Sequence, residues 1–396
     1  MMEQWKKTLA ICCFATFIVS IGMGQLAPML PIYIEELGIS DPAEISHWAG
    51  IIFGANFITL AIAAPIWGQL SDRYGRRPMV LRASLWLTII MIGMGFARSV
   101  WDLAVLRLIQ GAMSGFLGAV VSLIAQETPK QRSGWALGMF LSSQVGGALI
   151  GPLIGGFLAE QFNCRTTFIV IGCFCFLGFL AALCIKETAS VQPQKNKSSF
   201  ADCWKKLPQP QLIIKLAITN FILQFTLMSV HPIITVYIKS IIPETGHLAL
   251  ISGAVFSATG FASMISASPI GNLSDRIGPD KVLFSALIIA GFISIPQAFV
   301  TTPWQLGILR FILGIATAGL LPSINSLIRR YTPPDSLGRI YGFNQSAQFI
   351  GMFSGAFFGG TFSGIWGIPA ILIFSGIILL ANALAFRFLL PLKSIK

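Results

Sequence analysis

The stretch GQLSDRYG at residues 68–75 decides the fold, because it returns as GNLSDRIG at residues 271–278, an offset of 203 residues. The segments 129–156 and 333–360 match in nearly the same register, with an offset of 204 residues. They share a Pro, a Ser, a Gln and six glycines at equivalent positions. So many matches in register predict a chain built as two homologous halves, related by a pseudo-twofold axis.

The composition places most of the chain away from water. Of the 396 residues, 55% are hydrophobic and only 11% are charged, whereas a soluble globular protein carries roughly 25% charged residues. The mean hydropathy is +0.77. All fifteen Asp and Glu residues fall in expected loops or at the ends of apolar runs. We therefore predict an all-α integral membrane protein.

Twelve apolar runs are long enough for a spanning helix, which needs roughly 20 residues. We expect them at residues 8–33, 47–69, 79–97, 101–125, 134–158, 166–185, 212–238, 248–270, 281–299, 304–328, 340–362 and 366–390. The only long polar stretch lies between the sixth and seventh runs. The predicted domains are a six-helix bundle, a cytoplasmic linker and a second six-helix bundle, at residues 1–186, 187–211 and 212–396.

The net charge of +12 is distributed unevenly over the loops. Basic residues gather in every second loop, whereas the opposite loops keep only Arg98, Arg165 and Lys239. This asymmetry follows the positive-inside rule and predicts an inner (cytoplasmic) membrane protein of a bacterial cell with both termini in the cytoplasm. It argues against a nucleic-acid-binding protein. The seven cysteines show no metal-ligand spacing, so no metal is expected.

The loop at residues 68–77 combines glycines, which allow a tight turn, with one acid among arginines. A loop that only sets topology would explain the arginines but not the repeated acid. We expect Asp72 to hold a closed inner gate by facing the positive N-terminus of a helix near Gly338, and Asp275 to do the same near Gly134. The predicted gating residues are Gly68, Asp72, Arg73, Gly75, Arg76, Arg77, Asp275 and Arg276.

The run GGALIGPLIGG at residues 146–156 places glycines four apart on one helical face, where another helix can approach closely. Its proline removes a backbone hydrogen bond and favours a bend. Ordinary small-residue packing is the alternative. We predict a hinge, with Gly151 at the interface between the halves, made by Gly147, Gly151, Pro152, Gly155 and Gly156. The second half has Ala356 where the first has Pro152.

Two arginines and one histidine fall inside apolar runs, where a charge costs roughly 2.5–3.5 kcal/mol on insertion scales. Arg107 could instead reach outward past Asp102, and His231 could be a structural donor. No carboxylate lies at depth, which favours an anionic or neutral amphipathic solute over a lipophilic cation. The predicted substrate or proton residues are Arg107, Arg310, His231, Gln25, Gln110, Gln144, Asn220, Gln224 and Gln348. The aromatics that could line an apolar pocket, or simply pack, are Phe53, Phe57, Phe221, Phe225 and Trp366.

These motifs resemble those of the major facilitator superfamily. The run at 68–77 resembles motif A, Arg107 with Gln110-Gly111 resembles motif B, and the Gly-Pro run resembles the antiporter motif of drug:proton exporters. The resemblance covers the whole chain and is closest to the twelve-helix drug:proton antiporter branch and its MdtG group of multidrug resistance proteins, through residues 22–31, 48–53, 133–138 and 305–311. It implies a proton-driven exporter with alternating access. One departure is the absence of an acid at depth in the first run, where many members have one.

Several functions stay open at this point. A dedicated carrier of an anionic metabolite, such as a carboxylate siderophore, is the rival within transport, in either direction. A non-transporting membrane sensor is a remote alternative, because a sensor has no need of the repeated acid and the hinge. An enzyme is not expected, since no HExxH, nucleophile elbow or phosphate loop occurs. The expected partners are a small-molecule substrate, protons and the lipid bilayer, with a monomeric chain, no nucleic acid and no cofactor besides the proton gradient.

Overall fold

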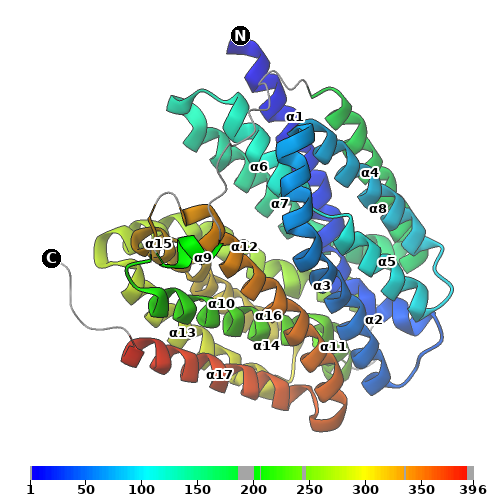
Figure 1. Ribbon diagram of the computed structural model, residues 1–396. Coiled ribbons are helices and arrows are strands. Elements are labelled where there is room, and N and C mark those ends of the chain that lie inside the picture. Colours follow the sequence, from blue (N-terminus) through cyan, green and yellow to red (C-terminus); the bar gives the residue numbers. More distant parts are fainter. Residues whose placement is uncertain (1, 186–199, 206, 243–246, 334–335, 390–396) are drawn as a thin grey trace.

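The computed structural model describes residues 2–185, 200–205, 207–242, 247–333 and 336–389. Within these ranges the chain forms helices and no strand, arranged as two bundles (Figure 1). The predicted all-α membrane fold with two six-helix bundles is therefore confirmed.

Six helical crossings build the first bundle, and two of them are broken near the middle or end. Its elements are α1 (Met2–Gly24) and α2 (Leu26–Glu36), α3 (Pro42–Tyr74), α4 (Arg76–Gly95), α5 (Val100–Ala112) and α6 (Phe116–Glu127), η1 (Lys130–Arg132), α7 (Ser133–Gln161) and α8 (Cys164–Leu183). The sequence predicts the first crossing as one run, whereas the helix is interrupted at Gln25.

The second bundle repeats this plan. Its elements are α10 (Pro210–Val230), η2 (His231–Ile233) and α11 (Ile234–Ile241), α12 (Leu248–Ile277), α13 (Pro279–Ser294) and η3 (Pro296–Phe299), α14 (Pro303–Thr317) and α15 (Leu320–Tyr331), α16 (Leu337–Trp366) and α17 (Ile368–Leu389). Between the bundles lies a short helix, α9 (Phe200–Lys205). Of the predicted linker at 187–211, residues 187–199 and 206 lie outside the described residues, so the exact domain boundaries stay a prediction.

Eleven of the twelve crossings are long and apolar enough, among the described residues, to span a membrane by length and composition. The remaining crossing is α16, a helix of 30 residues. Seven glycines and several polar side chains lower its hydropathy. Its length still exceeds the roughly 20 residues that a span requires.

Helix ends follow local sequence signals. Asp41 caps α3 by accepting a hydrogen bond from the backbone N–H of Glu44 at 3.2 Å. Ser99 and Asp102 form a capping box at the start of α5. Gly75 and Gly278 end α3 and α12 with φ values of +96° and +100°, a conformation that favours glycine. The glycine-dependent turn predicted in both copies of the repeat is thus present.

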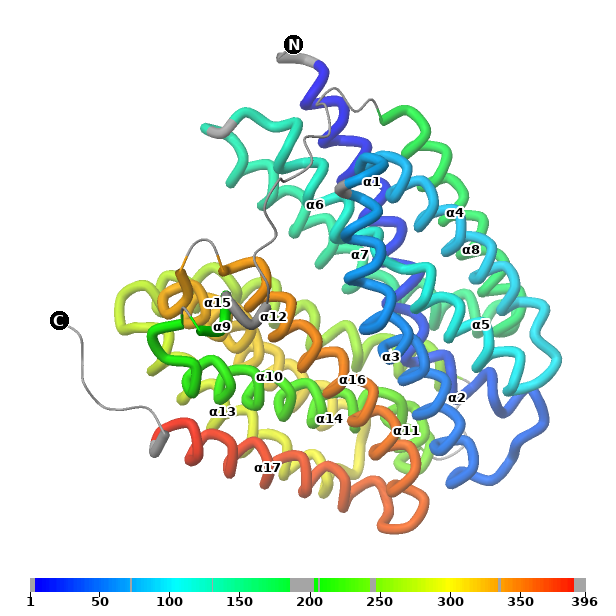
Figure 2. Tube along the Cα trace, viewed as in Figure 1, coloured from blue at the N-terminus to red at the C-terminus, as the bar shows by residue number. Residues whose placement is uncertain are grey.

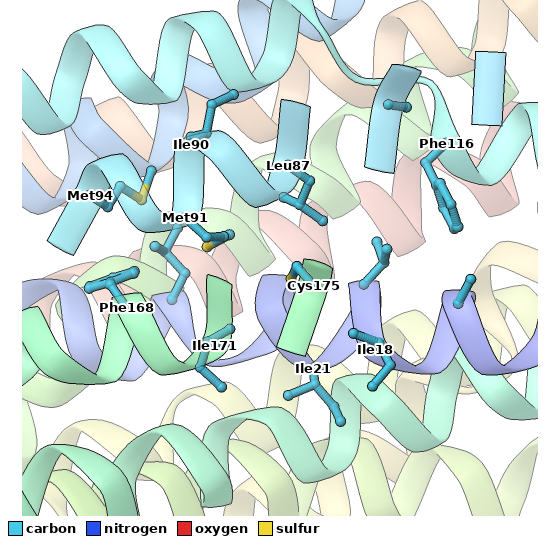
Figure 3. Packing of buried hydrophobic residues seen from close by; sticks show 14 of the residues in the cluster. Ile18, Ile21, Leu87, Ile90, Met91, Met94, Phe116, Phe168, Ile171 and Cys175 are labelled. Atoms are coloured by element: carbon cyan, nitrogen blue, oxygen red, sulfur yellow. The ribbon is translucent and has the colours of Figure 1, made fainter. Parts of the chain in front are cut away.

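Apolar side chains fill the inside of each bundle. In the first bundle, Ile18 and Ile21 of α1 belong to one cluster of buried apolar side chains with Met91 of α4 and Phe168 of α8 (Figure 3). Large apolar side chains are also exposed outward, such as Trp304, which is 82% exposed. A soluble monomer rarely exposes so many of them, whereas lipid tails cover such a surface.

Candidate functional site

The two bundles touch along two helix pairs, the first of which is α3 with α16. Gly50 and Gly360 face each other so closely that a Cβ on Gly50 would lie 2.8 Å from the Gly360 Cα. A Cβ on Gly360 would lie 2.5 Å from the carbonyl oxygen of Ser46. A second Gly, Gly54, lies against Phe353 one turn further along. Only residues without a Cβ allow this approach of two backbones.

The second pair, α7 with α12, reproduces this contact at the equivalent positions. A Cβ on Gly156 would lie 2.5 Å from the carbonyl oxygen of Ala249, and Gly253 lies against the backbone of Pro152. The hydroxyl of Ser257 donates to the Leu149 carbonyl at 2.7 Å. Offsets of 203 and 204 residues relate these positions to those of the first pair. The two contacts are therefore related by the pseudo-twofold axis.

The same helix pairs separate toward the end where α3 finishes and α7 begins. A Cβ on any glycine there would meet no atom within 4 Å, at Gly68, Gly134, Gly138, Gly271, Gly338 and Gly342. Figure 2 shows the bundles diverging toward this end, where α1 begins and α17 finishes. We call it the open end, and the end where residues 36–42 join α2 to α3 the closed end.

Polar contacts also join the bundles at the closed end. The Lys239 Nζ atom lies 2.5 Å from a carboxylate oxygen of Glu35. Glu160 accepts a hydrogen bond from the backbone N–H of Leu250 at 3.1 Å and lies 3.1 Å from the His247 ring nitrogen. A carboxylate suits this position because α12 begins there, where the helix dipole is positive. A surface cleft of about 610 Å³ lies beside the Glu35–Lys239 pair, on the closed side.

The predicted gating residues lie at the open end, as their loop requires. Arg76 donates to the Gln126 amide at 2.8 Å and Arg77 to the Leu183 carbonyl at 3.1 Å, so they attach the start of α4 to α6 and α8. Arg73 lies over the ring of Tyr74, while Asp275 and Arg276 are exposed. The side chain of Asp72 lies outside the described residues. Its contact with α16 therefore stays a prediction.

The predicted hinge glycines do not share one neighbour. Gly147 and Gly151 face α1, where a Cβ on Gly151 would lie 2.6 Å from the Ile21 carbonyl oxygen, and Gly155 faces Gln25 at the break between α1 and α2. The prediction that Gly151 lies between the bundles is therefore wrong, because it packs inside the first bundle. Gly156 makes the contact with α12 instead. A glycine spacing of four identifies a helical face but not the helix that covers it.

Arg107 is almost fully buried, with 1% of its surface exposed, and each nitrogen of its guanidinium donates a hydrogen bond to a neighbouring residue. Its guanidinium donates to the carbonyl oxygens of Ile52 and Phe53, both at 3.2 Å, and to the Gln110 amide oxygen at 2.5 Å. Gln110 in turn donates toward the Met23 sulfur. These bonds join α5 to α3 and explain the buried charge without a ligand.

Arg310 is 3% exposed, and its Nε and Nη2 atoms have no partner among the described residues. It lies close enough to the His231 ring to act on it electrostatically. His231 occupies the break between α10 and α11, with its ring centre 5.5 Å from that of Phe256 and 6.4 Å from that of Phe53. The histidine thus lies between aromatic rings of both bundles. Its position suits a residue whose surroundings change when the bundles move.

The remaining predicted polar residues are spread over the bundles. Gln25 is fully buried at the break between α1 and α2, and neither atom of its amide has a partner among the described residues. Asn220 donates weakly to the Asn344 carbonyl at 3.4 Å. Gln224 is buried, whereas the repeat-related Gln144 and Gln348 are half-buried.

The predicted aromatic residues form two groups. Phe53 and Phe57 pack edge to face, 5.6 Å apart, on the first bundle near His231. Phe221 and Phe225 stack within the second bundle, and Trp366 joins a cluster around Phe358 there. The ring contact of Phe53 with His231 joins the two bundles.

Sequence reasoning missed the residues that hold the closed end. Gly253 repeats Gly50 at an offset of 203 residues, and Lys239 repeats Glu35 at 204. Residues related by a twofold axis can meet where they lie close to it, and the opposite charges of Glu35 and Lys239 are the signal that could have identified this pair. The contact of Glu160 with His247 has no such signal, because the residues equivalent to these two are Gly364 and Glu44, of which the first has no side chain.

Comparison with known proteins gives the family. A family model for the Major Facilitator Superfamily matches residues 12–257 and 216–396. This chain belongs to the major facilitator superfamily. Multidrug resistance protein MdtG of Escherichia fergusonii is 38% identical over 380 residues, which cover 96% of this chain and 93% of that protein. MdtG of Proteus mirabilis is 39% identical over 381 residues, covering 96% and 95%. The resemblance predicted from the motifs is confirmed.

Solved structures of superfamily transporters share the fold. The nucleoside transporter NupG superposes with a TM-score of 0.80 at 13% identity, over 97% of this chain and all of that chain. An inward-facing, unoccupied bacterial homologue of the lysosomal transporter Spinster gives 0.77 at 13% identity, over 98% of this chain and 97% of its own. The chain is therefore a multi-pass secondary transporter, and its family takes small-molecule substrates rather than performing enzymatic chemistry.

Proposed function

We propose that this transporter is a drug:proton antiporter-like exporter that moves anionic or neutral amphipathic small molecules by alternating access. The observation that carries the proposal is the pair of repeat-related contacts, which close one end of the interface while the same helices separate at the other. Relatives that align with 96% of this chain, at 38% and 39% identity, are named multidrug resistance proteins, which supports export of drugs.

The open end is proposed to face the cytoplasm. Most of the basic residues flank it, including Arg76, Arg276 and Arg330, whereas the closed end keeps Arg98, Arg165 and Lys239. By the positive-inside rule both termini then lie in the cytoplasm of a bacterial cell with the chain in the inner membrane. The arrangement described here is accordingly the inward-facing state, ready to take a solute from the cytoplasm.

Rocking of the bundles requires that the closed end opens as the open end closes. The glycine contacts at the closed end are small and related by symmetry, so both can separate together. We propose that Asp72 then faces the start of α16 and Asp275 the start of α7, where a helix N-terminus attracts an anion by about 0.3–2 kcal/mol. These contacts would replace the ones lost at the closed end.

Protons are proposed as the energy source, with no other cofactor and with a monomeric chain as the working unit. His231 is a titratable group that lies between the bundles, beside aromatic rings from both. Its ordinary titration range includes physiological pH. Protonation of His231 would change the free energy of keeping its ring between Phe53 and Phe256. This change would link proton uptake to the movement of the bundles.

Everted membrane vesicles with an acidic lumen test the proposal, since an exporter should accumulate its solute in them while protons leave. A panel of labelled anionic, neutral and cationic amphiphiles is added with and without an ionophore that abolishes the pH gradient. We expect accumulation of anionic or neutral compounds that the ionophore abolishes, and loss of this dependence in His231→Gln. Accumulation that is indifferent to the gradient would contradict proton coupling, and no accumulation of any compound would contradict export.

A dedicated carrier of one anionic metabolite is the second candidate. It is favoured by Arg310, whose buried guanidinium has two nitrogens without partners among the described residues. The same vesicle panel separates the two, because a dedicated carrier would accept one carboxylate and reject unrelated amphiphiles.

A further inference from the structure

The two buried arginines related by the repeat differ in what they bind. Arg107 and Arg310 occupy equivalent positions at an offset of 203 residues, on α5 and α14. All three nitrogens of Arg107 donate hydrogen bonds to α3 or to its own helix. For Arg310, the buried Nε and Nη2 atoms have no partner in the described part of the chain. Arg107 therefore has a structural partner for each nitrogen, whereas Arg310 has two nitrogens without a partner among the described residues.

The sequence differs at one of the three partners of Arg107. The partner of Arg107 on its own helix is Gln110, one turn later, and the equivalent residue after Arg310 is Leu313. A leucine offers no oxygen. The second bundle has thus kept the buried charge but lost the partner of the Nη1 atom, whereas the Nε and Nη2 atoms of Arg107 bind backbone carbonyls of α3.

Neighbouring groups on α12 also have unused hydrogen-bonding capacity. Arg310 shares a face of α14 with Gly307 and Gly314, and a Cβ on Gly314 would meet the backbone of Thr259 on α12. The hydroxyl of Thr259 has no partner among the described residues, and neither has that of Ser252, two helical turns away. The only acids between residues 248 and 317 are Asp275 and Asp280, at the open end. The surroundings of Arg310 therefore supply donors but no carboxylate.

A buried guanidinium without a partner is costly and is stabilised by an anion. The two free nitrogens, Nε and Nη2, form one side of the guanidinium fork, which matches the two oxygens of a carboxylate. His231, which lies within electrostatic range of Arg310, packs its ring against that of Phe256, and these rings offer aromatic surface for the rest of a solute.

We propose that Arg310 binds the transported solute by a side-on contact of Nε and Nη2 with an organic carboxylate, and that Arg107 takes no part in binding. The inference rests on the proposed transport function and adds to it the chemical class of the solute and the bundle that recognises it. Recognition then lies in the second bundle alone, although both bundles carry the arginine.

An amide oxygen beside Arg310 tests this, because it competes with a carboxylate for the guanidinium. Leu313→Gln supplies such an oxygen at the position equivalent to Gln110, and Leu313→Met is the matched control because it has a similar size and no oxygen. Binding to the full-length protein in detergent is measured for a panel of aromatic and aliphatic carboxylates that includes naphthoate, and for the uncharged naphthamide. We expect the affinity for carboxylates to fall at least tenfold in Leu313→Gln and in Arg310→Gln, with Leu313→Met unchanged. Arg310→Lys should not restore binding, since an ammonium has no fork.

Each other outcome is informative. Equal losses in Leu313→Gln and Leu313→Met would assign the effect to packing and overturn the inference, as would a wild-type protein that binds no carboxylate. Vesicles that accumulate naphthamide while all variants bind naphthoate equally would overturn the inference and leave the export function intact. Carboxylate binding that needs Arg310, without accumulation in vesicles, would support the site and contradict export.

Discussion

Replacing Gly50 with leucine is expected to open the closed end of the molecule. Even the Cβ atom of a residue at position 50 would lie 2.8 Å from the Cα and 3.1 Å from the nitrogen of Gly360. Both are backbone atoms, so no rotation of a side chain relieves the clash and the two helices must separate. Overpacking of this kind costs typically about 1–3 kcal/mol. The clash destabilises only the closed arrangement, because it disappears once the helices separate. A destabilisation of about 2 kcal/mol would raise the ratio of open to closed molecules at this end roughly 30-fold.

Pulsed electron paramagnetic resonance measures this change. Spin labels are attached to cysteines at Ser40 and Ser240, which are exposed on different bundles beside the closed-end cleft, after the native cysteines have been replaced. The Gly50→Leu protein should show a longer label-to-label distance than the unmodified background. Gly118→Leu is the control, because a Cβ there would meet no atom within 4 Å. A folded Gly50→Leu protein with an unchanged distance distribution would refute the reasoning.

Four further expectations concern single contacts. Glu35→Lys should loosen the closed end by about 0.2–1 kcal/mol, the range for an exposed ion pair, and adding Lys239→Glu should restore it in the same label-distance measurement at low salt. Arg107→Ala should lower the thermal unfolding temperature in detergent, because it leaves the buried Gln110 amide oxygen unpaired at about 1–3 kcal/mol, and Arg107→Lys should not restore it. Gly151→Leu should destabilise the first bundle by about 1–3 kcal/mol, seen as a lower unfolding temperature, rather than produce a leak in vesicles. Asp72→Asn should abolish transport in vesicles while expression stays normal, and full transport would contradict its gating role.

The sequence predicts the fold well because repetition and hydropathy are properties of the chain itself. It predicts the contacts less well because they depend on which neighbour a residue meets. The glycine spacing that includes Gly151 identified a close helix–helix contact, but α1 and α12 were equally possible partners. Charge and depth likewise marked Arg107 and Arg310 as alike. Only the positions of the Ile52 and Phe53 carbonyls show that one of them is satisfied.

Symmetry and asymmetry have separate roles in this molecule. The contacts that must form and break together are repeated in both bundles, as with Gly50 against Gly360 and Gly253 against Pro152. A movement that separated only one pair of helices would tilt the bundles and press the other pair together. Symmetric contacts therefore favour a single concerted opening. Recognition has the opposite requirement, since one solute binds in one orientation and needs a single set of donors. Of the two repeat-related arginines, only Arg310 has guanidinium nitrogens without partners among the described residues, so the bundles can differ in recognition while the contacts on which they move stay symmetric.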